Sequence, residues 1–337
     1  MVSALASAVS IREVGPRDGF QNEPEVIPTE RKVELIDALA RTGLKRLEVT
    51  SFVRPEVIPQ LADAAEVLTR IDVPEGVSVS VLIPNERGLE KALALRDTAR
   101  SAIGRANRPA FDEVNVFLSA SETHNRENVN RSISESLAGL EIVLGRAREA
   151  GLRCEGVIST SFGCPYEGDV PLERVLGIAA RLRDAGAEEI GFGDTTGMAN
   201  PRQVREFFTA ARDRLGPAGA AATRSGAAGP AHADRVQLTA HFHNTRGQGL
   251  ANVLAALDAG VESFESSFGE LGGCPVPAGA TGNIASEDLV SMLHEMGIST
   301  GIDLPALIAC ARRVREVLRR PLGSHTLVAG PVDWHKG

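Results

Sequence analysis

The sequence predicts a (β/α)8 barrel, a closed sheet of eight parallel strands that are each followed by a helix. Short apolar runs alternate with amphipathic helical segments through most of the chain, and neither kind of element gathers in one region. This strand–helix unit also repeats eight times. A doubly wound open sheet would share the alternation, but such sheets rarely contain so many regular units. The barrel is therefore the favoured fold class.

The individual elements follow from apolar spacing and from turn residues. The first strand is predicted over residues 9–14, ending at Gly15 and Pro16, and the first helix over residues 29–42, where Gly43 ends it. The other strands are short apolar runs at 44–50, 76–83, 113–120, 151–159, 188–193, 235–243 and 261–267. The helices that follow them have apolar residues at helical spacing over about 60–70, 86–97, 132–150, 171–185, 200–215, 247–259 and 286–296.

We expect one domain over residues 1–337, with two additions to the barrel. Residues 216–234 are a low-complexity stretch of Gly, Ala and Pro, which we expect to form a mobile loop. The stretch joins the sixth helix to the seventh strand, so it should lie on the N-terminal face, opposite to the face where barrel enzymes act. A further helix is expected in the C-terminal extension from about residue 304.

Composition limits the classes of function. A net charge of −8 and an aromatic content of 4% argue against a nucleic-acid surface. The longest apolar segments are shorter than the about 20 residues that span a bilayer, so we expect no membrane partner. The N-terminal residues lack the basic residues of signal and transit peptides, and four cysteines without a CxxC pair indicate reduced thiols. We expect a cytoplasmic protein.

Polar residues follow the predicted strands at their C-terminal ends. Because all strands of the barrel run the same way, these residues should meet on one face, where barrel enzymes bind their substrates. Arg17 and Asp18 alone could equally form a simple salt bridge at the end of a strand. The set taken together argues for a site, and it comprises Arg17, Asp18, Glu48, Asp194, His241, His243 and Asn283.

A metal site is predicted within this set. His241 and His243 are two residues apart on one strand, so both imidazoles should point into the mouth of the barrel. Asp18 and Asn283 would add oxygen ligands, which makes two core histidines with ordinary hydrogen bonds the less favoured interpretation. This mostly hard donor set favours Mg²⁺ or Mn²⁺, and Co²⁺ or Zn²⁺ also fit it.

The segment Leu271-Gly-Gly-Cys274-Pro predicts a glycine-rich loop over the barrel mouth. Cys274 in such a loop could close on a substrate and act as an acid or a nucleophile. Cys154 and Cys310 fall within predicted elements and are expected to be buried small apolar residues, and Cys164 is expected to be structural.

Several motifs together resemble the 3-hydroxy-3-methylglutaryl-CoA (HMG-CoA) lyase family of metal-dependent barrel lyases and synthases. They are GPRDGFQNE, LEVTSFVRPEVIPQLAD, SASETHNRENVNRS, GCPYEG, GDTTG, HFH and LGGCP…GATGNIASEDL, in the family's order from about Ile11 to Leu318. The resemblance implies cleavage of an acyl-CoA substrate, HMG-CoA, to acetyl-CoA and acetoacetate. It also implies a homodimer.

The resemblance further implies a role for each site residue. Asp18, His241, His243 and Asn283 match the metal ligands, Arg17 matches the catalytic arginine, Glu48 matches the acid that holds it and Cys274 matches the loop cysteine. Asp18, Asp194 and His241 are all candidates for the base. Gln21, Ser51 and Thr195, which lie in the same motifs, are expected to bind substrate.

The chain also departs from the family pattern. Asn244-Thr245-Arg246 stands where familiar lyases have Asp-Thr-Tyr, and Arg319-Arg320-Pro321 lacks a nearby lysine. We therefore expect Asn244 and Arg246 to change the pocket for the substituent at C3 of the substrate. Three alternatives stay open: a lyase for a related 3-hydroxyacyl-CoA, a Claisen-type synthase that condenses acetyl-CoA with a 2-oxo acid, and a non-catalytic metal-binding scaffold.

Overall fold

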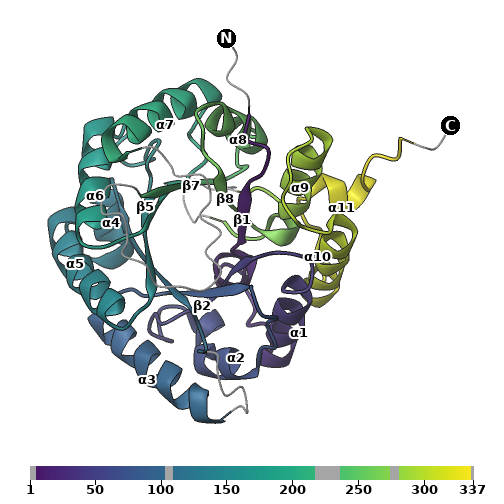
Figure 1. Cartoon of the computed structure of the whole chain (residues 1–337), viewed down its shortest axis with the longest axis horizontal. Helices are drawn as coiled ribbons and strands as arrows, with labels where there is room; N and C mark the ends of the chain where they lie inside the picture. The colour runs from purple at the N-terminus through teal and green to yellow at the C-terminus, as the bar shows by residue number, and fades with distance from the viewer. Residues whose placement is uncertain (1–4, 103–108, 217–235, 274–280, 335–337) are drawn as a thin grey trace.

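The computed structural model describes residues 5–102, 109–216, 236–273 and 281–334. Its eight strands form a closed barrel in which every neighbouring pair is parallel and β8 returns to β1. The helices surround the barrel (Figure 1), which confirms the predicted fold class. The strands are β1 (Ser10–Glu13), β2 (Arg46–Ser51), β3 (Ser78–Leu82), β4 (Glu113–Ser119), β5 (Arg153–Ser159), β6 (Glu189–Asp194), β7 (Gln237–Phe242) and β8 (Ser263–Ser266).

The helices lie close to the predicted ranges, except for two helices, α4 and α11, that were not predicted from the sequence. They are α1 (Thr29–Leu39), α2 (Ala64–Arg70), α3 (Glu86–Ala102), α4 (Glu122–Val129), α5 (Ile133–Glu149), α6 (Leu172–Asp184), α7 (Pro201–Leu215), α8 (Gly249–Asp258), α9 (Ser286–Glu295), α10 (Leu304–Leu318) and α11 (His325–Ala329). Short turns of other helix types are η1 (Gly15–Gly19), η2 (Pro59–Leu61) and η3 (Phe268–Glu270). Figure 1 shows α9, α10 and α11 on the side of the barrel where β1 and α1 lie. Among the described residues, none of the helices has both the length and the apolar character that crossing a membrane requires.

Helix α4 is absent from the sequence prediction. Its residues are almost all polar, so it has no apolar face that helical spacing could reveal. Ser121 caps the start of the helix, because its side chain accepts a hydrogen bond from the backbone N–H of His124. Asn125 is buried within it and accepts from the backbone N–H of Ser119 at 3.0 Å. Capping and one buried amide thus stabilise a helix that lacks an apolar face.

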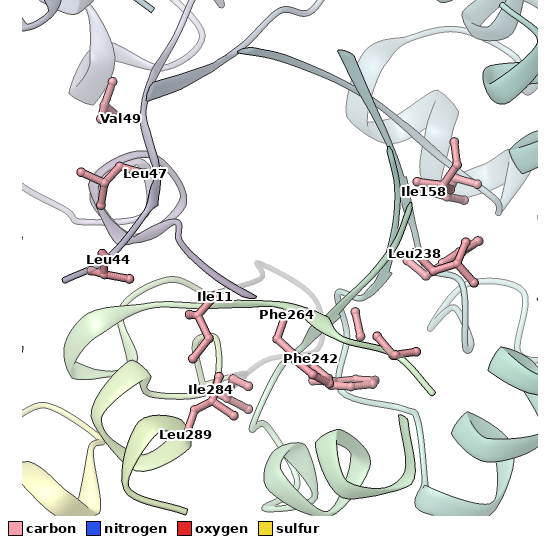
Figure 2. Packing of buried hydrophobic residues seen from close by; sticks show 14 of the residues in the cluster. Ile11, Leu44, Leu47, Val49, Ile158, Leu238, Phe242, Phe264, Ile284 and Leu289 are labelled. Carbon is pink, nitrogen blue, oxygen red and sulfur yellow. The ribbon is translucent and has the colours of Figure 1, made fainter. Parts of the chain in front are cut away.

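Apolar side chains pack between the barrel and its helices. Figure 2 shows Ile11, Leu47, Ile158 and Phe264 on the outer side of the strands. The neighbouring residues in each strand point to the other side, into the barrel. Arg12 of β1, for example, contacts Glu155 of β5 inside the barrel. The barrel therefore has an apolar exterior and a polar interior, which places charged groups below the C-terminal face.

The two predicted additions differ in what the structure shows. Helix α10 (Leu304–Leu318) lies where the C-terminal extension was predicted. The low-complexity stretch lies outside the described residues except for Gly216, which follows α7 directly.

Candidate active site

Arg17 and Asp18 lie in η1, the single helical turn that follows β1. The turn packs against the segment after β8, and glycine allows this close approach at two points. A Cβ on Gly15 would lie 2.5 Å from the Phe268 ring, and one on Gly19 would lie 2.7 Å from Cβ of Leu271. The space around Gly19 is closed to any larger residue, so glycine is required there by this close approach.

The Arg17 guanidinium is held between two carboxylates. One of its nitrogens, Nη1, donates to Asp18 Oδ1 at 2.7 Å, and Nη2 pairs with Glu48 Oε2 at 2.7 Å. Glu48 is fully buried and also accepts from Asn115 at 3.1 Å. The Arg17 Nε is buried and has no hydrogen-bond partner among the described residues. Two contacts therefore fix the guanidinium, and its Nε–H is left without a partner in the described part of the chain.

His241 and His243 bring their imidazoles together at the end of β7. Their Nε2 atoms are 3.1 Å apart, and the ligand atoms of Asp18 and of the two histidines all lie within 4.8 Å of one another. Asn283 pairs with His243 through an isolated bridge, and its Nδ2 donates to Asp18 Oδ2 at 2.8 Å. The four residues predicted as metal ligands are thus one contact cluster.

The cluster fits a divalent cation. A single hydrogen at most can lie between the two Nε2 atoms, so at least one of them presents a lone pair to the cluster. The Asn283 Oδ1 atom is buried without a hydrogen-bond partner among the described residues, which suits an oxygen ligand. Two imidazole nitrogens with carboxylate and amide oxygens form a donor set for divalent metals.

The local charges also favour a cation. Burial opposes ionisation of Asp18, but the charges of Arg17 and His241 and the hydrogen bond from Asn283 outweigh it and lower the pKa of the carboxyl group. Burial and the charge of His241 lower the pKa of His243 to about 3. At neutral pH, Asp18 is therefore ionised and His243 is neutral, and these are the forms that coordinate metals.

The other predicted residues lie around this cluster or outside the described chain. Gln21 donates to Asp18 Oδ1 at 2.9 Å. Ser51 and Asp194 are the last residues of β2 and β6, and Thr195 follows β6, so all three lie on the C-terminal face. Cys274 lies outside the described residues, which end before it at Gly273.

Asp194 is engaged through one carboxylate oxygen. Its Oδ1 accepts from the backbone N–H groups of Met198 and Ala199, whereas Oδ2 is buried without a partner among the described residues. Burial raises the pKa of Asp194 to about 7.

Asn244 and Arg246 follow β7, beside the metal-binding strand as expected, and their side chains contact neighbouring loops. Arg246 donates from Nη1 to the carbonyl oxygens of Thr196 at 2.9 Å and Gly197 at 2.7 Å, and Asn244 contacts Glu270 at 3.4 Å. Both side chains thus join neighbouring loops to one another. Their effect on the pocket for the C3 substituent stays a prediction.

Glu265 is a neighbour of the site that the sequence analysis missed. Its Oε2 lies 2.9 Å from His241 Nδ1, on the ring edge away from His243. Phe264 lies between Ser263 and Glu265 in β8, and the two-residue period of a strand places Glu265 inside the barrel if Phe264 packs on the outer side.

The fold and the site define a (β/α)8-barrel protein with an imidazole–carboxylate cluster at the C-terminal face. The sequence model of the HMGL-like family matches residues 8–314, and the chain belongs to this family.

Individual relatives agree over nearly the whole length. The chain is 44% identical to a hydroxymethylglutaryl-CoA lyase of Bacillus subtilis, over 95% of this chain and 96% of that protein. It is 39% identical to the mitochondrial hydroxymethylglutaryl-CoA lyase of Gallus gallus, over 95% of this chain and 97% of that one. A solved HMG-CoA lyase of Acinetobacter baumannii, in complex with coenzyme A and 3-methylmalate, superposes with a TM-score of 0.84 at 37% identity, covering 98% of this chain and 97% of that one.

Proposed function

We propose that this protein is a hydroxymethylglutaryl-CoA lyase, which cleaves HMG-CoA to acetyl-CoA and acetoacetate with a divalent cation, Mg²⁺ in the first place. The observation that carries the proposal is the contact cluster of Arg17, Asp18, His241, His243 and Asn283 at the C-terminal face. It occurs in a chain that is 44% identical over 95% of its length to a relative of this name.

The metal ligands would be Asp18, His241, His243 and Asn283. A divalent cation held there polarises hydroxyl and carboxylate oxygens and lowers the pKa of the hydroxyl group. The protein supplies the remaining chemistry through Arg17, a base and Cys274.

Arg17 is placed to stabilise the enolate that forms when the carbon–carbon bond breaks. Its Nη1 and Nη2 atoms contact Asp18 and Glu48, so the guanidinium group cannot rotate freely. The unpartnered Nε is left to donate to an oxygen of the substrate. Because negative charge grows on the thioester oxygen during cleavage, this interaction strengthens toward the transition state.

Asp194 is the candidate base that has a carboxylate oxygen to spare. Both oxygens of Asp18 are engaged by neighbouring side chains, and His241 Nδ1 is bonded to Glu265. Asp194 Oδ2 is without a partner among the described residues, and a pKa of about 7 suits proton transfer near neutral pH. We assign it the removal of the hydroxyl proton and Cys274 the protonation of the enolate carbon.

The direct test is an assay of purified protein with HMG-CoA and Mg²⁺, in which acetyl-CoA and acetoacetate should form in equal amounts. Matched reactions with 3-hydroxyglutaryl-CoA and a longer C3 analogue define the preferred substituent through kcat/KM. Light scattering in solution tests the homodimer that we expect. Cleavage of none of these substrates, with condensation of acetyl-CoA onto a 2-oxo acid instead, would refute the proposal in favour of a synthase.

A further inference from the structure

A layer of buried charges fills the barrel interior below the candidate metal site. Its members come from six strands, and none of them is more than 7% exposed. The layer comprises Arg12, Arg46, Glu113, Glu155, Glu189 and Glu265. Four carboxylates thus share the barrel interior with two guanidinium groups.

Arg12 joins most of this layer together. Its Nη1 donates to Glu265 Oε1 at 2.9 Å and also contacts Glu155. Its Nη2 lies 3.3 Å from carboxylate oxygens of both Glu113 and Glu189. Because Arg12 is fully buried and contacts four carboxylates, its guanidinium is held in one orientation.

Glu265 connects this layer to the histidine cluster. One of its oxygens, Oε1, binds Arg12, and the other, Oε2, lies 2.9 Å from His241 Nδ1. The pairing of the strands produces this arrangement, because Glu265 of β8 is in register with His241 on one side and with Arg12 on the other. The contacts therefore run from Arg12 through Glu265 to His241.

The consequence concerns the second nitrogen of the imidazole. A carboxylate that accepts from Nδ1–H fixes both the tautomer and the rotation of the ring, and leaves the Nε2 lone pair for a metal. In this structure His241 Nε2 points to His243 Nε2, at 3.1 Å, and into the cluster with Asp18. Without the contact to Glu265, the His241 ring could rotate, and metal binding would then have to restrict that rotation.

We propose that Glu265 is a positioning residue for metal binding: held by Arg12, it fixes His241 with Nε2 directed at the cation. The proposal rests on the metal-ligand role given to His241 under the proposed function. Both oxygens of Glu265 are engaged, one by Arg12 and the other by His241, so we assign it no direct contact with substrate or metal.

The test is metal binding by Glu265→Gln, measured by titration calorimetry with Mn²⁺ on metal-free protein. Loss of a residue that orients a ligating histidine lowers metal affinity by about 10–100-fold, and we expect a loss in this range. Co²⁺ titration provides a second measurement, because the visible absorption bands of Co²⁺ change when the geometry of its ligands changes.

Glu113→Gln is the matched control. Glu113 is a glutamate of the same layer that binds Arg46 at 3.1 Å and Arg153 at 2.9 Å. This variant removes one buried charge and its 3.3 Å contact with Arg12 Nη2, but it leaves the contact of Arg12 Nη1 with Glu265 and the contact of Glu265 with His241 in place. We expect its Mn²⁺ affinity to stay close to that of the wild type and its Co²⁺ spectrum to be unchanged.

Two results would overturn the proposal: wild-type Mn²⁺ affinity in folded Glu265→Gln, or an equal loss in Glu113→Gln. If Glu265→Gln does not fold, Glu265→Asp takes its place, since it keeps the charge but moves the carboxylate away from His241. Reduced affinity of this variant supports the proposal and unchanged affinity overturns it. In a His241→Ala background, the change at Glu265 should cause no further loss.

Failure of the proposed function would look different. Wild-type protein that cleaves no acyl-CoA but loses Mn²⁺ affinity on Glu265→Gln refutes only the lyase. Wild-type protein that cleaves HMG-CoA, with a Glu265→Gln variant that binds Mn²⁺ normally, refutes only the positioning role.

Discussion

Replacing Glu48 tests how the protein holds its catalytic arginine. Glu48→Ala removes the partner of Arg17 Nη2, and Glu48→Gln keeps an oxygen that can accept the hydrogen bond but removes the charge. Asp18 would then be the remaining partner of the guanidinium. If Arg17 stabilises the enolate, a guanidinium that is free to move should slow the reaction without changing the ligands of the metal.

The magnitude follows from the burial of the pair. The Glu48 side chain is fully buried and the Arg17 side chain is 13% exposed, so solvent screens their attraction little. A hydrogen bond to a charged group contributes about 1.5–3 kcal/mol, and a displacement of about 1 Å at a reacting centre can lower a rate about 10²-fold. We therefore expect kcat of Glu48→Ala to fall by about 10²-fold and that of Glu48→Gln by about 10-fold, the latter equal to about 1.4 kcal/mol.

The assay is the steady-state cleavage of HMG-CoA under saturating Mg²⁺, together with Mn²⁺ affinity and thermal unfolding. Glu141→Ala is the matched control, since it removes a carboxylate from a surface pair with Arg181 whose side chains are 46% and 35% exposed. Such surface pairs contribute below about 1 kcal/mol, and this variant should keep its kcat. Mn²⁺ affinity of both Glu48 variants should stay within a few-fold of the wild type.

One pattern would refute the reasoning. If Glu48→Ala turns over at the wild-type rate while Arg17→Gln is inactive, Arg17 acts without being held by Glu48. A fall in kcat accompanied by an equal fall in metal affinity would also show that Glu48 acts on the metal site.

Three further predictions follow from the site and its surroundings. Exhaustive chelation should abolish activity and Mg²⁺ should restore it, and full activity after chelation would contradict the metal site. His243→Ala should lose metal affinity but keep its fold, because the residue lies beyond the last residue of β7. Cys274→Ala should lower kcat by about 10²–10⁴-fold with metal affinity intact, whereas a wild-type rate would mean that the thiol donates no proton. Burial raises the pKa of Glu287 from 4.5 to about 8, so its contribution to stability is full below the unfolded pKa and is lost as the pH rises to about 8. The free energy of unfolding of Glu287→Gln, relative to that of the wild type, should therefore rise by up to about 1.4 kcal/mol per pH unit in this range. A difference between the two proteins that is constant with pH would refute the raised pKa of Glu287.

The order of the elements and the face that carries the site could be predicted from the sequence. Apolar spacing is a local property, and it separates strands from helices wherever one face is buried, as in α6 and α7. The same-side placement of His241 and His243 follows from the two-residue period of a strand. Helix α4 lacks an apolar face, so local spacing failed there.

What only the tertiary structure decided is which polar groups meet inside the barrel. Arg12 and Glu265 are 253 residues apart in sequence, and the register of β1 on β8 brings them together when the barrel closes. The same holds for Glu265 and His241, which face each other through the register of β8 on β7. The sequence determines which residues point inward in each strand, because that period is local. The closed sheet determines their partners, because register depends on all eight strands at once.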